Sequence, residues 1–177
     1  MRAVDPCGLK RAALINDLSC FGKCSLSVSM PILSAYGVET VPLPTAILST
    51  HTGGFTGFVV QDMTENMRLF AAHWKKLGVK FDAIITSVGS GNRIGYLARL
   101  DGRVTCVQKP VVDMTLHGAG DVFTSALCGE LLSGQAPQNA LLHAADFCDS
   151  CIHETAKRQP GHWYGLAFEP VLKGNRV

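Results

Sequence analysis

The sequence has no long hydrophobic run and no strongly charged segment. No stretch approaches the roughly 20 consecutive apolar residues of a membrane-spanning helix, and the first residues lack the charged start and apolar run of a signal peptide. The 16 basic and 14 acidic residues are dispersed and give a net charge of +2. These absences argue against a membrane or nucleic-acid partner. We therefore expect a cytoplasmic protein whose partners are small molecules.

The cysteines do not have the spacing of a metal site. Cys148 and Cys151 form a CxxC pair, and Cys20 and Cys24 a CxxxC pair, but neither has a second ligand pair at zinc-finger spacing. The chain has seven cysteines, an odd number, and an intracellular chain of this length typically keeps its thiols reduced. The sequence therefore favours buried structural thiols, without disulfides and without a bound metal.

No internal repeat is present, and 177 residues with 47% hydrophobic content suit a single domain with a proper core. Residues 1–9 have no hydrophobic period and contain Pro and Gly, so we expect a loose N-terminal leader. Residues 10–177 then form one domain.

The hydrophobic pattern of this domain alternates between strands and helices. Its first part predicts a strand at Arg11–Ile15 and a polar turn at Asn16–Cys24. A helix at Ser25–Tyr36, ended by Gly37, and a second strand at Val38–Leu43 follow. This order predicts a parallel strand pair with a right-handed crossover.

The rest of the chain continues the alternation. A polar loop at Thr45–Thr56 precedes a helix at Asp62–Leu77, closed by Gly78, and a third strand at Phe81–Ser87. A hairpin of Arg93–Leu100 and Arg103–Gln108 follows, with its turn at Asp101-Gly102. The last predicted elements are a strand at Val111–Leu116 and helices at Val122–Leu132 and Gln138–Lys157. The predicted fold class is α/β, with a mostly parallel sheet flanked by helices.

The sequence Gly-Ala-Gly-Asp at Gly118–Asp121 lies between a predicted strand and an apolar helix. Such a loop presents backbone N–H groups at a helix N-terminus, where an anion such as a phosphoryl group is stabilised. The carboxylate of Asp121 is placed to accept a proton from an attacking hydroxyl. Alternatively, the glycines only shape a turn and Asp121 caps the helix.

Two further polar segments, Asn16–Ser25 and Ser49–Phe55, each follow a predicted strand. Both should therefore lie at one edge of the sheet, where short polar side chains could hydrogen-bond a small heteroaromatic ligand. Taken singly, each segment is more often a helix cap or a polar turn than a binding site.

These segments together resemble the bacterial pyridoxal/pyridoxamine kinases, relatives of the hydroxymethylpyrimidine kinases in the ribokinase superfamily. The likeness rests on NDLSCFGKCSLSVSMPILSAYGVETVPLPTAILSTHTGGF, from Asn16, and LHGAGDVFTSALCGELL, from Leu116, and extends from Lys10 almost to the C-terminus. The resemblance implies a ribokinase-like fold and ATP-dependent phosphorylation of the 5′-hydroxymethyl group of a B6 vitamer. It also implies ATP and Mg²⁺, and leaves a homodimer open.

The resemblance assigns roles to individual residues. Asp121 matches the catalytic base, and its anion hole corresponds to Gly118, Ala119 and Gly120. The vitamer would contact Asp17, His51 and Thr52, and the nucleotide Thr86, Ser87 and Gly89. The aromatic residues Trp163, Tyr164 and Phe168 would only pack the C-terminal segment onto the domain and take no part in the site.

The resemblance also shows that the middle of the family's chain is missing. A lid-bearing turn, a DPVMGD-like strand end that helps to hold Mg²⁺ and phosphate, and an N-x-x-E segment have no counterpart between Ile84 and Thr86. Loss of central parallel strands should uncover apolar faces of their neighbours. The chain is thus expected to be an impaired pyridoxal kinase. The alternatives are a non-catalytic or ligand-binding remnant, or a hydroxymethylpyrimidine kinase, which Asp17 favours.

Overall fold

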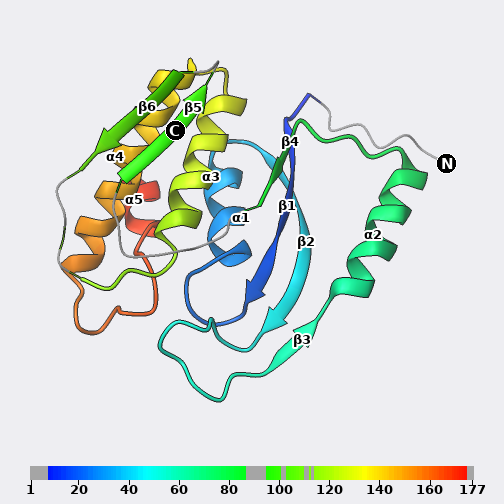
Figure 1. Cartoon of the computed structure of the whole chain (residues 1–177), viewed down its shortest axis with the longest axis horizontal. Coiled ribbons are helices and arrows are strands. Elements are labelled where there is room, and N and C mark those ends of the chain that lie inside the picture. The colour runs from blue at the N-terminus through cyan, green and yellow to red at the C-terminus, as the bar shows by residue number, and fades with distance from the viewer. Residues whose placement is uncertain (1–7, 87–94, 101–102, 110–111, 113, 175–177) are drawn as a thin grey trace.

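The computed structural model describes residues 8–86, 95–100, 103–109, 112 and 114–174. A four-stranded sheet lies at its centre, in the order β3-β2-β1-β4, and a separate two-stranded sheet is formed by β5 and β6 (Figure 1). The strands are β1 (Arg11–Ser19), β2 (Glu39–Leu48), β3 (Val60–Asp62), β4 (Ala83–Ile85), β5 (Gly95–Leu100) and β6 (Arg103–Gln108). The helices are α1 (Leu26–Ala35), α2 (Thr64–Leu77), α3 (Ala119–Leu132), α4 (Pro137–Ala156) and α5 (Glu169–Gly174).

The predicted parallel strands are confirmed. β1 pairs in parallel with β2 on one side and with β4 on the other, and only the short β3 runs antiparallel, at the edge beside β2. Helices α1 and α3 lie on one side of the sheet and α2 on the other, while the β5–β6 hairpin lies against α4 (Figure 1). The fold is therefore an open, mostly parallel α/β sheet, as the sequence predicts.

Both early strands are longer than predicted. β1 continues through Asn16 to Ser19, and β2 continues to Leu48, because the two strands keep pairing as far as Ser19 with Leu48. The register shifts between Asn16 and Leu18, where Asn16 lies opposite Pro44. Proline has no N–H to donate to the ladder, so an irregularity is expected there. Asp17 lies at this irregular point, inside the strand rather than in a turn.

Three other assignments need correction. The third strand is only Ala83–Ile85, and of its predicted range Ser87 lies outside the described residues. Of the strand predicted at 111–116, residues 112 and 114–116 have no strand structure. The sequence analysis did not predict β3 or α5, which are only three and six residues long. Such short elements carry too little periodicity to be recognised.

The helix ends follow from the sequence. Gly37, directly after Tyr36 at the end of α1, and Gly78 at the end of α2 have φ angles of 73° and 69°. These left-handed conformations are easy for glycine and costly for other residues. Pro137 opens α4 in the first turn, where its missing N–H has no intrahelical acceptor to lose.

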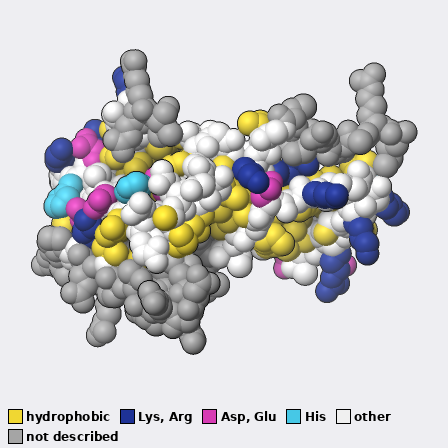
Figure 2. Space-filling view, turned by 90° about the horizontal axis from the view of Figure 1, so that it is seen from above, with side chains coloured by type: hydrophobic (Ala, Val, Ile, Leu, Met, Phe, Trp, Pro, Cys, Tyr) yellow, Lys and Arg dark blue, Asp and Glu magenta, His cyan; other side chains and the backbone are white. Residues whose placement is uncertain are grey.

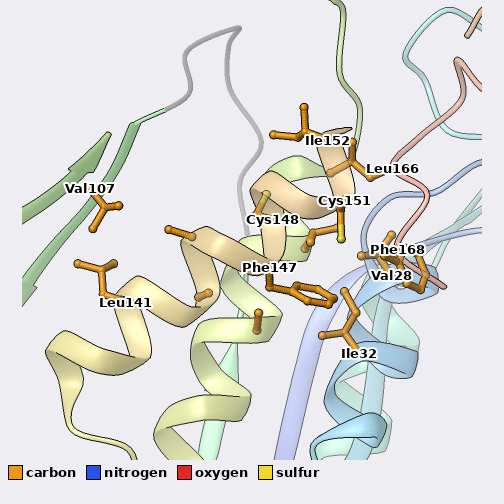
Figure 3. Packing of buried hydrophobic residues seen from close by; sticks show 14 residues of the cluster. Val28, Ile32, Val107, Leu141, Phe147, Cys148, Cys151, Ile152, Leu166 and Phe168 are labelled. Atoms are coloured by element: carbon orange, nitrogen blue, oxygen red, sulfur yellow. The ribbon is translucent and has the colours of Figure 1, made fainter. Parts of the chain in front are cut away.

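The main hydrophobic core lies between α1, α3, α4 and the segment before α5, not on the α2 side. Figure 3 shows side chains of α1 and α4 meeting the C-terminal segment, with Val107 of β6 against Leu141. The packed residues include Val28, Ile32, Leu141, Phe147, Cys148, Cys151, Ile152, Leu166 and Phe168. The CxxC thiols of Cys148 and Cys151 are thus buried and part of the core, in agreement with their predicted structural role.

The α2 side of the sheet is sparsely covered. Not one residue of α2 is buried, and Ile84 of β4 is 68% exposed whereas its neighbour Ile85 is buried. Figure 2 shows a band of hydrophobic side chains across the middle of the molecule in this view. A four-stranded sheet with an uncovered face is what the missing central segments predict.

Within the described residues, no helix combines the length and apolar character that crossing a bilayer requires.

Candidate active site

Asp17 is held by two serine hydroxyl groups at the carboxyl end of β1. The Ser25 hydroxyl donates to Asp17 Oδ1 at 2.5 Å, and the Ser19 hydroxyl donates to Asp17 Oδ2 at 2.9 Å. Both carboxylate oxygens are therefore held in place, and each can still accept a hydrogen bond from a ligand.

Asp121 is joined to the same serine. The backbone N–H of Ser25 donates to Asp121 Oδ2 at 2.7 Å. Ser25 thus contacts Asp17 through its side chain and Asp121 through its backbone. The fold brings together two carboxylates that are 104 positions apart in the sequence.

The Gly-Ala-Gly-Asp turn packs tightly against the loop before α1. Gly118 has a φ angle of 80°, and a Cβ atom on it would lie 2.3 Å from the carbonyl oxygen of Lys23. Helix α3 begins at the next residue, Ala119, with Asp121 in its first turn. The N–H groups of a first helical turn have no acceptor within the helix and form the positive end of the helix dipole. This end of α3 is therefore suited to an anion.

Cys24 lies among these groups. Its pKa is raised to about 12, first by burial and then by the negative charges of Asp121 and Asp17. The thiol therefore stays protonated at neutral pH. It is a neutral neighbour of the two carboxylates and not a nucleophile.

His51 is a buried residue of the loop after β2. Its Nδ1 accepts a hydrogen bond from the backbone N–H of Gly53 at 3.0 Å, so Nε2 carries the proton and donates to the Tyr164 carbonyl, also at 3.0 Å. A Cβ atom on Gly22 would lie 2.1 Å from the imidazole ring. Both ring nitrogens are thus already bonded to the backbone, and His51 joins three loops. Thr52 beside it is exposed.

His117 was not foreseen as a site residue. The ring centroids of His117 and His51 are 5.1 Å apart. A Cβ atom added to Gly53 would lie 2.5 Å from the His117 ring. The pKa of His117 is lowered, first by burial and then by His51. The residue lies directly before Gly118, so this neutral ring connects the loop after β2 with the Gly-Ala-Gly-Asp turn.

The aromatic residues near the C-terminus do more than pack their own segment, which corrects the sequence-based interpretation. Trp163 stacks against Phe55 with ring centroids 4.6 Å apart, and Tyr164 lies 5.2 Å from Phe21. The backbone N–H of Lys23 donates to the Tyr164 carbonyl at 2.9 Å. The segment therefore supports both polar loops of the site. No periodicity marks it, and its only signal is a cluster of aromatic residues.

The nucleotide residues are only partly described. Thr86 directly follows β4 and is exposed, whereas Ser87 and Gly89 lie outside the described residues. Because β4 runs parallel to β1, Thr86 lies toward the same end of the sheet as Asp17. Lys109 forms an ion pair with Asp146 of α4.

The described residues do not fit the Mg²⁺ ion that the resemblance implies. Among them, no group of three or more His, Cys, Asp or Glu side chains could hold a metal ion. Asp17 and Asp121, the two carboxylates at the site, are each engaged by Ser25. Mg²⁺ at kinase sites usually takes one or two protein carboxylates, with substrate phosphates and water as its other ligands, and here each such carboxylate already accepts a hydrogen bond from Ser25. We therefore assign no step to a metal.

Solved structures of two kinds of vitamin kinase share this fold. A Bacteroides thetaiotaomicron protein assigned as a phosphomethylpyrimidine kinase is 23% identical, with a TM-score of 0.85 over 96% of this chain and 95% of that chain. The pyridoxal kinase of Lactobacillus plantarum is 18% identical, with a TM-score of 0.80 over 94% and 96%. That of Staphylococcus aureus, bound to AMP-PCP and pyridoxal, is 13% identical, with a TM-score of 0.72 over 96% of each chain.

The similarity extends over most of the chain, so the fold is the ribokinase-like fold of these kinases. The Bacteroides protein has also been crystallised with pyridoxal. No protein-family model and no curated protein matches the sequence.

Proposed function

We propose that the chain binds a B6 vitamer at the carboxyl end of β1 and is an impaired, ATP-dependent pyridoxal kinase. Asp17, His51 and Thr52 would form the vitamer side of this site. Asp121 would act as the base, with Gly118, Ala119 and Gly120 as the anion hole, and the nucleotide would lie toward Thr86, Ser87 and Gly89. We place the reaction in the cytoplasm, where cysteine thiols are kept reduced.

The observation that carries the proposal is the Ser25 bridge between Asp17 and Asp121. It joins the carboxylate of Asp17 and that of Asp121, at the N-terminus of α3, to one residue, which supports a shared role for them. Solved proteins of the same fold contain pyridoxal or an ATP analogue, which supports this choice of substrates.

The chemistry assigned to this chain is a single displacement. The 5′-hydroxyl oxygen of the vitamer attacks the γ-phosphorus of ATP, the bond to the β,γ-bridging oxygen breaks, and ADP leaves with that electron pair. Asp121 accepts the hydroxyl proton. The N–H groups at the start of α3 stabilise the negative charge on the transferred phosphoryl group.

We expect binding and turnover to be separated in this chain. The vitamer half-site and the Gly-Ala-Gly-Asp turn are present, but the segment that should hold metal and triphosphate has no counterpart, and the described residues hold no substitute cluster. Phosphoryl transfer depends on positioning and charge neutralisation, and a base alone does not replace them.

Calorimetry with pyridoxal and a coupled assay of pyridoxal phosphate formation test both halves. We expect saturable binding with turnover far below the usual kinase range of about 1 to 100 per second. Turnover within that range would contradict the impairment, and absence of binding would contradict the vitamer site.

The base is tested by Asp121→Asn, with Asp146→Asn as the matched control on the exposed side of α4. Residual phosphorylation should fall about 100-fold or more in Asp121→Asn while pyridoxal affinity changes little, because the base acts on the way to the transition state. Equal losses of affinity and rate would assign Asp121 a structural role.

A second candidate is a kinase of the hydroxymethylpyrimidine type. The presence of Asp17 favours it. An aspartate can accept a hydrogen bond from an aminopyrimidine amino group. Titration of pyridoxal and of the hydroxymethylpyrimidine side by side decides between the candidates, because the true substrate class should bind more tightly.

A further inference from the structure

Ser25 has an unusual backbone for a serine at the start of a helix. Its φ and ψ angles are 56° and −130°, and within the described residues it is the one non-glycine residue with a positive φ. This region is costly for any residue with a Cβ atom, and it persists only where the surrounding structure enforces it. Such strain is commonly associated with functional sites.

The hydroxyl of Ser25 is not used for capping. A serine before a helix normally accepts a hydrogen bond from the second or third helical N–H. Ser25 makes no such side-chain bond, although its carbonyl accepts from Val28 and Ser29. Its hydroxyl donates instead to Asp17, and its N–H donates to Asp121. A glycine would adopt this backbone more easily, so the hydroxyl explains why a serine is present.

We propose that Ser25 is a positioning residue that fixes Asp17 and Asp121 relative to each other. The inference rests on the proposed function and extends it: a vitamer held by Asp17 is presented to Asp121 at a distance that Ser25 sets. Ser25 itself contacts neither substrate in this proposal. It is 8% exposed, and the N–H, the hydroxyl and the carbonyl each have a partner within the protein.

Ser19 provides the matched control. Its hydroxyl also donates to Asp17, but to the other oxygen. Loss of the Ser19 hydroxyl therefore removes one bond to Asp17 without breaking the connection to Asp121. Loss of the Ser25 hydroxyl removes both the bond and the connection.

The test is a double-mutant cycle of Asp17→Asn and Asp121→Asn, measured as the pyridoxal Kd by calorimetry in three backgrounds. With Ser25 and Ser19 intact, the two changes should be non-additive by at least about twofold in Kd, because contacting or bridged residues couple. In the Ser25→Ala background the effects should become additive. In the Ser19→Ala background the non-additivity should remain. Coupling that survives Ser25→Ala would overturn the proposal.

A second arm needs no ligand. The same cycle is measured by the midpoint of urea unfolding, so the bridge is tested even if the chain binds no pyridoxal. Absence of pyridoxal binding would contradict the proposed function but not the positioning role of Ser25. Additivity with Ser25 intact would then overturn the inference.

Ser25→Gly also lacks the hydroxyl but tolerates the backbone, so it replaces Ser25→Ala if the latter does not fold. It should unfold at a urea concentration no lower than that of Ser25→Ala and lose the coupling equally. Retained coupling in Ser25→Gly would likewise overturn the inference. Where turnover is measurable, the KM for pyridoxal should rise in Ser25→Gly with the KM for ATP unchanged, which a general loss of structure does not produce.

Discussion

Gly118 and Gly120 look alike in the sequence but have different roles in the structure. Gly118 has a positive φ, and an added Cβ atom would lie 2.3 Å from the Lys23 carbonyl oxygen. Gly120 lies in the first turn of α3 with nothing within 4 Å of an added Cβ atom. The first is therefore required by the backbone and the second is not.

We expect Gly118→Ala to lower the free energy of unfolding by about 2 kcal/mol or more, because it adds backbone strain to a collision with fixed backbone. Gly120→Ala should be neutral or slightly stabilising, since alanine is the better helix former. Urea unfolding of the two variants measures the difference. Equal stabilities would show that the close contact between the turn and Lys23 is absent.

His117 should make stability depend on pH. Its pKa in the folded chain lies below the ordinary histidine value of about 6.5, because of burial first and His51 second. As pH falls through that value, the unfolded chain takes up a proton that the folded chain resists. The free energy of unfolding should therefore be unaffected by this group above about pH 7.5 and decrease below about pH 6.5.

Unfolding midpoints at pH 7.5 and 5.5 measure this loss. His117→Gln should reduce it but not abolish it, because the pKa of His162 is also lowered, mainly by burial. His143→Gln, on the exposed side of α4, is the control. An unchanged pH dependence in His117→Gln would contradict the prediction.

Individual site residues differ in how visible they are in the sequence. Asp121 and its glycines stand out because phosphate chemistry needs a Gly-rich turn before a helix, and Asp17 follows from the resemblance. Ser25 ends the polar segment Asn16–Ser25 that the pattern singles out, but it received no role of its own, because its role depends on a backbone angle that no residue pattern encodes. The contacts of Trp163 and Tyr164 are formed between segments more than 100 residues apart. Such contacts are properties of the folded chain.

Among the elements, α2 and α4 differ sharply in burial. Helix α4 has nine buried residues, whereas α2 has none. Most helical stability in proteins comes from packing of an apolar face rather than from propensity. Helix α2 should therefore open locally far more easily than α4.

Hydrogen exchange of the backbone amides measures this difference. We expect the amides of α2 to exchange at least about tenfold faster than those of the middle of α4, because local opening of a poorly packed element costs little. Comparable protection of both helices would mean that a further contact covers α2 in solution.

The elements also show where sequence reasoning ends. The ranges of the four longer helices and of the hairpin were predicted to within a few residues, because long periodic runs and Asp-Gly turns are local signals. The extensions of β1 and β2 were missed, since they contain polar residues and one proline, Pro44, and exist because each strand pairs with the other. Pairing of this kind is decided by tertiary structure.

At the scale of the whole molecule, the main sheet of the described residues has four strands and ends at β4. Within the described residues β4 has a neighbour only on the β1 side, and its inward residue Ile85 is buried while Ile84 faces outward. Parallel strands are normally covered on both faces. The uncovered strand agrees with the expectation, drawn from the resemblance, that central segments are missing.

This uncovered face should bind hydrophobic probes in the native state. Ile84 of β4 is 68% exposed and Leu69 of α2 is 67% exposed. Other exposed large apolar residues are Phe70 of α2 and, between β2 and α2, Phe58, Val59 and Val60. Exposed apolar patches attract hydrophobic dyes and promote self-association. We expect the folded chain to enhance the fluorescence of anilinonaphthalene sulfonate and to self-associate as its concentration rises.

The double variant Ile84→Ser with Leu69→Ser should lower both signals while changing the free energy of unfolding by less than about 0.5 kcal/mol per site, because neither side chain is packed. Leu142→Ser, at a residue 48% exposed on α4, is the control and should leave both signals unchanged. Dye fluorescence, sedimentation velocity and urea unfolding on the same samples provide the measurements. A marked loss of stability in the double variant would show that the face is covered in solution. A second copy of the chain, or residues outside the described ranges, would then have to cover the open sheet edge.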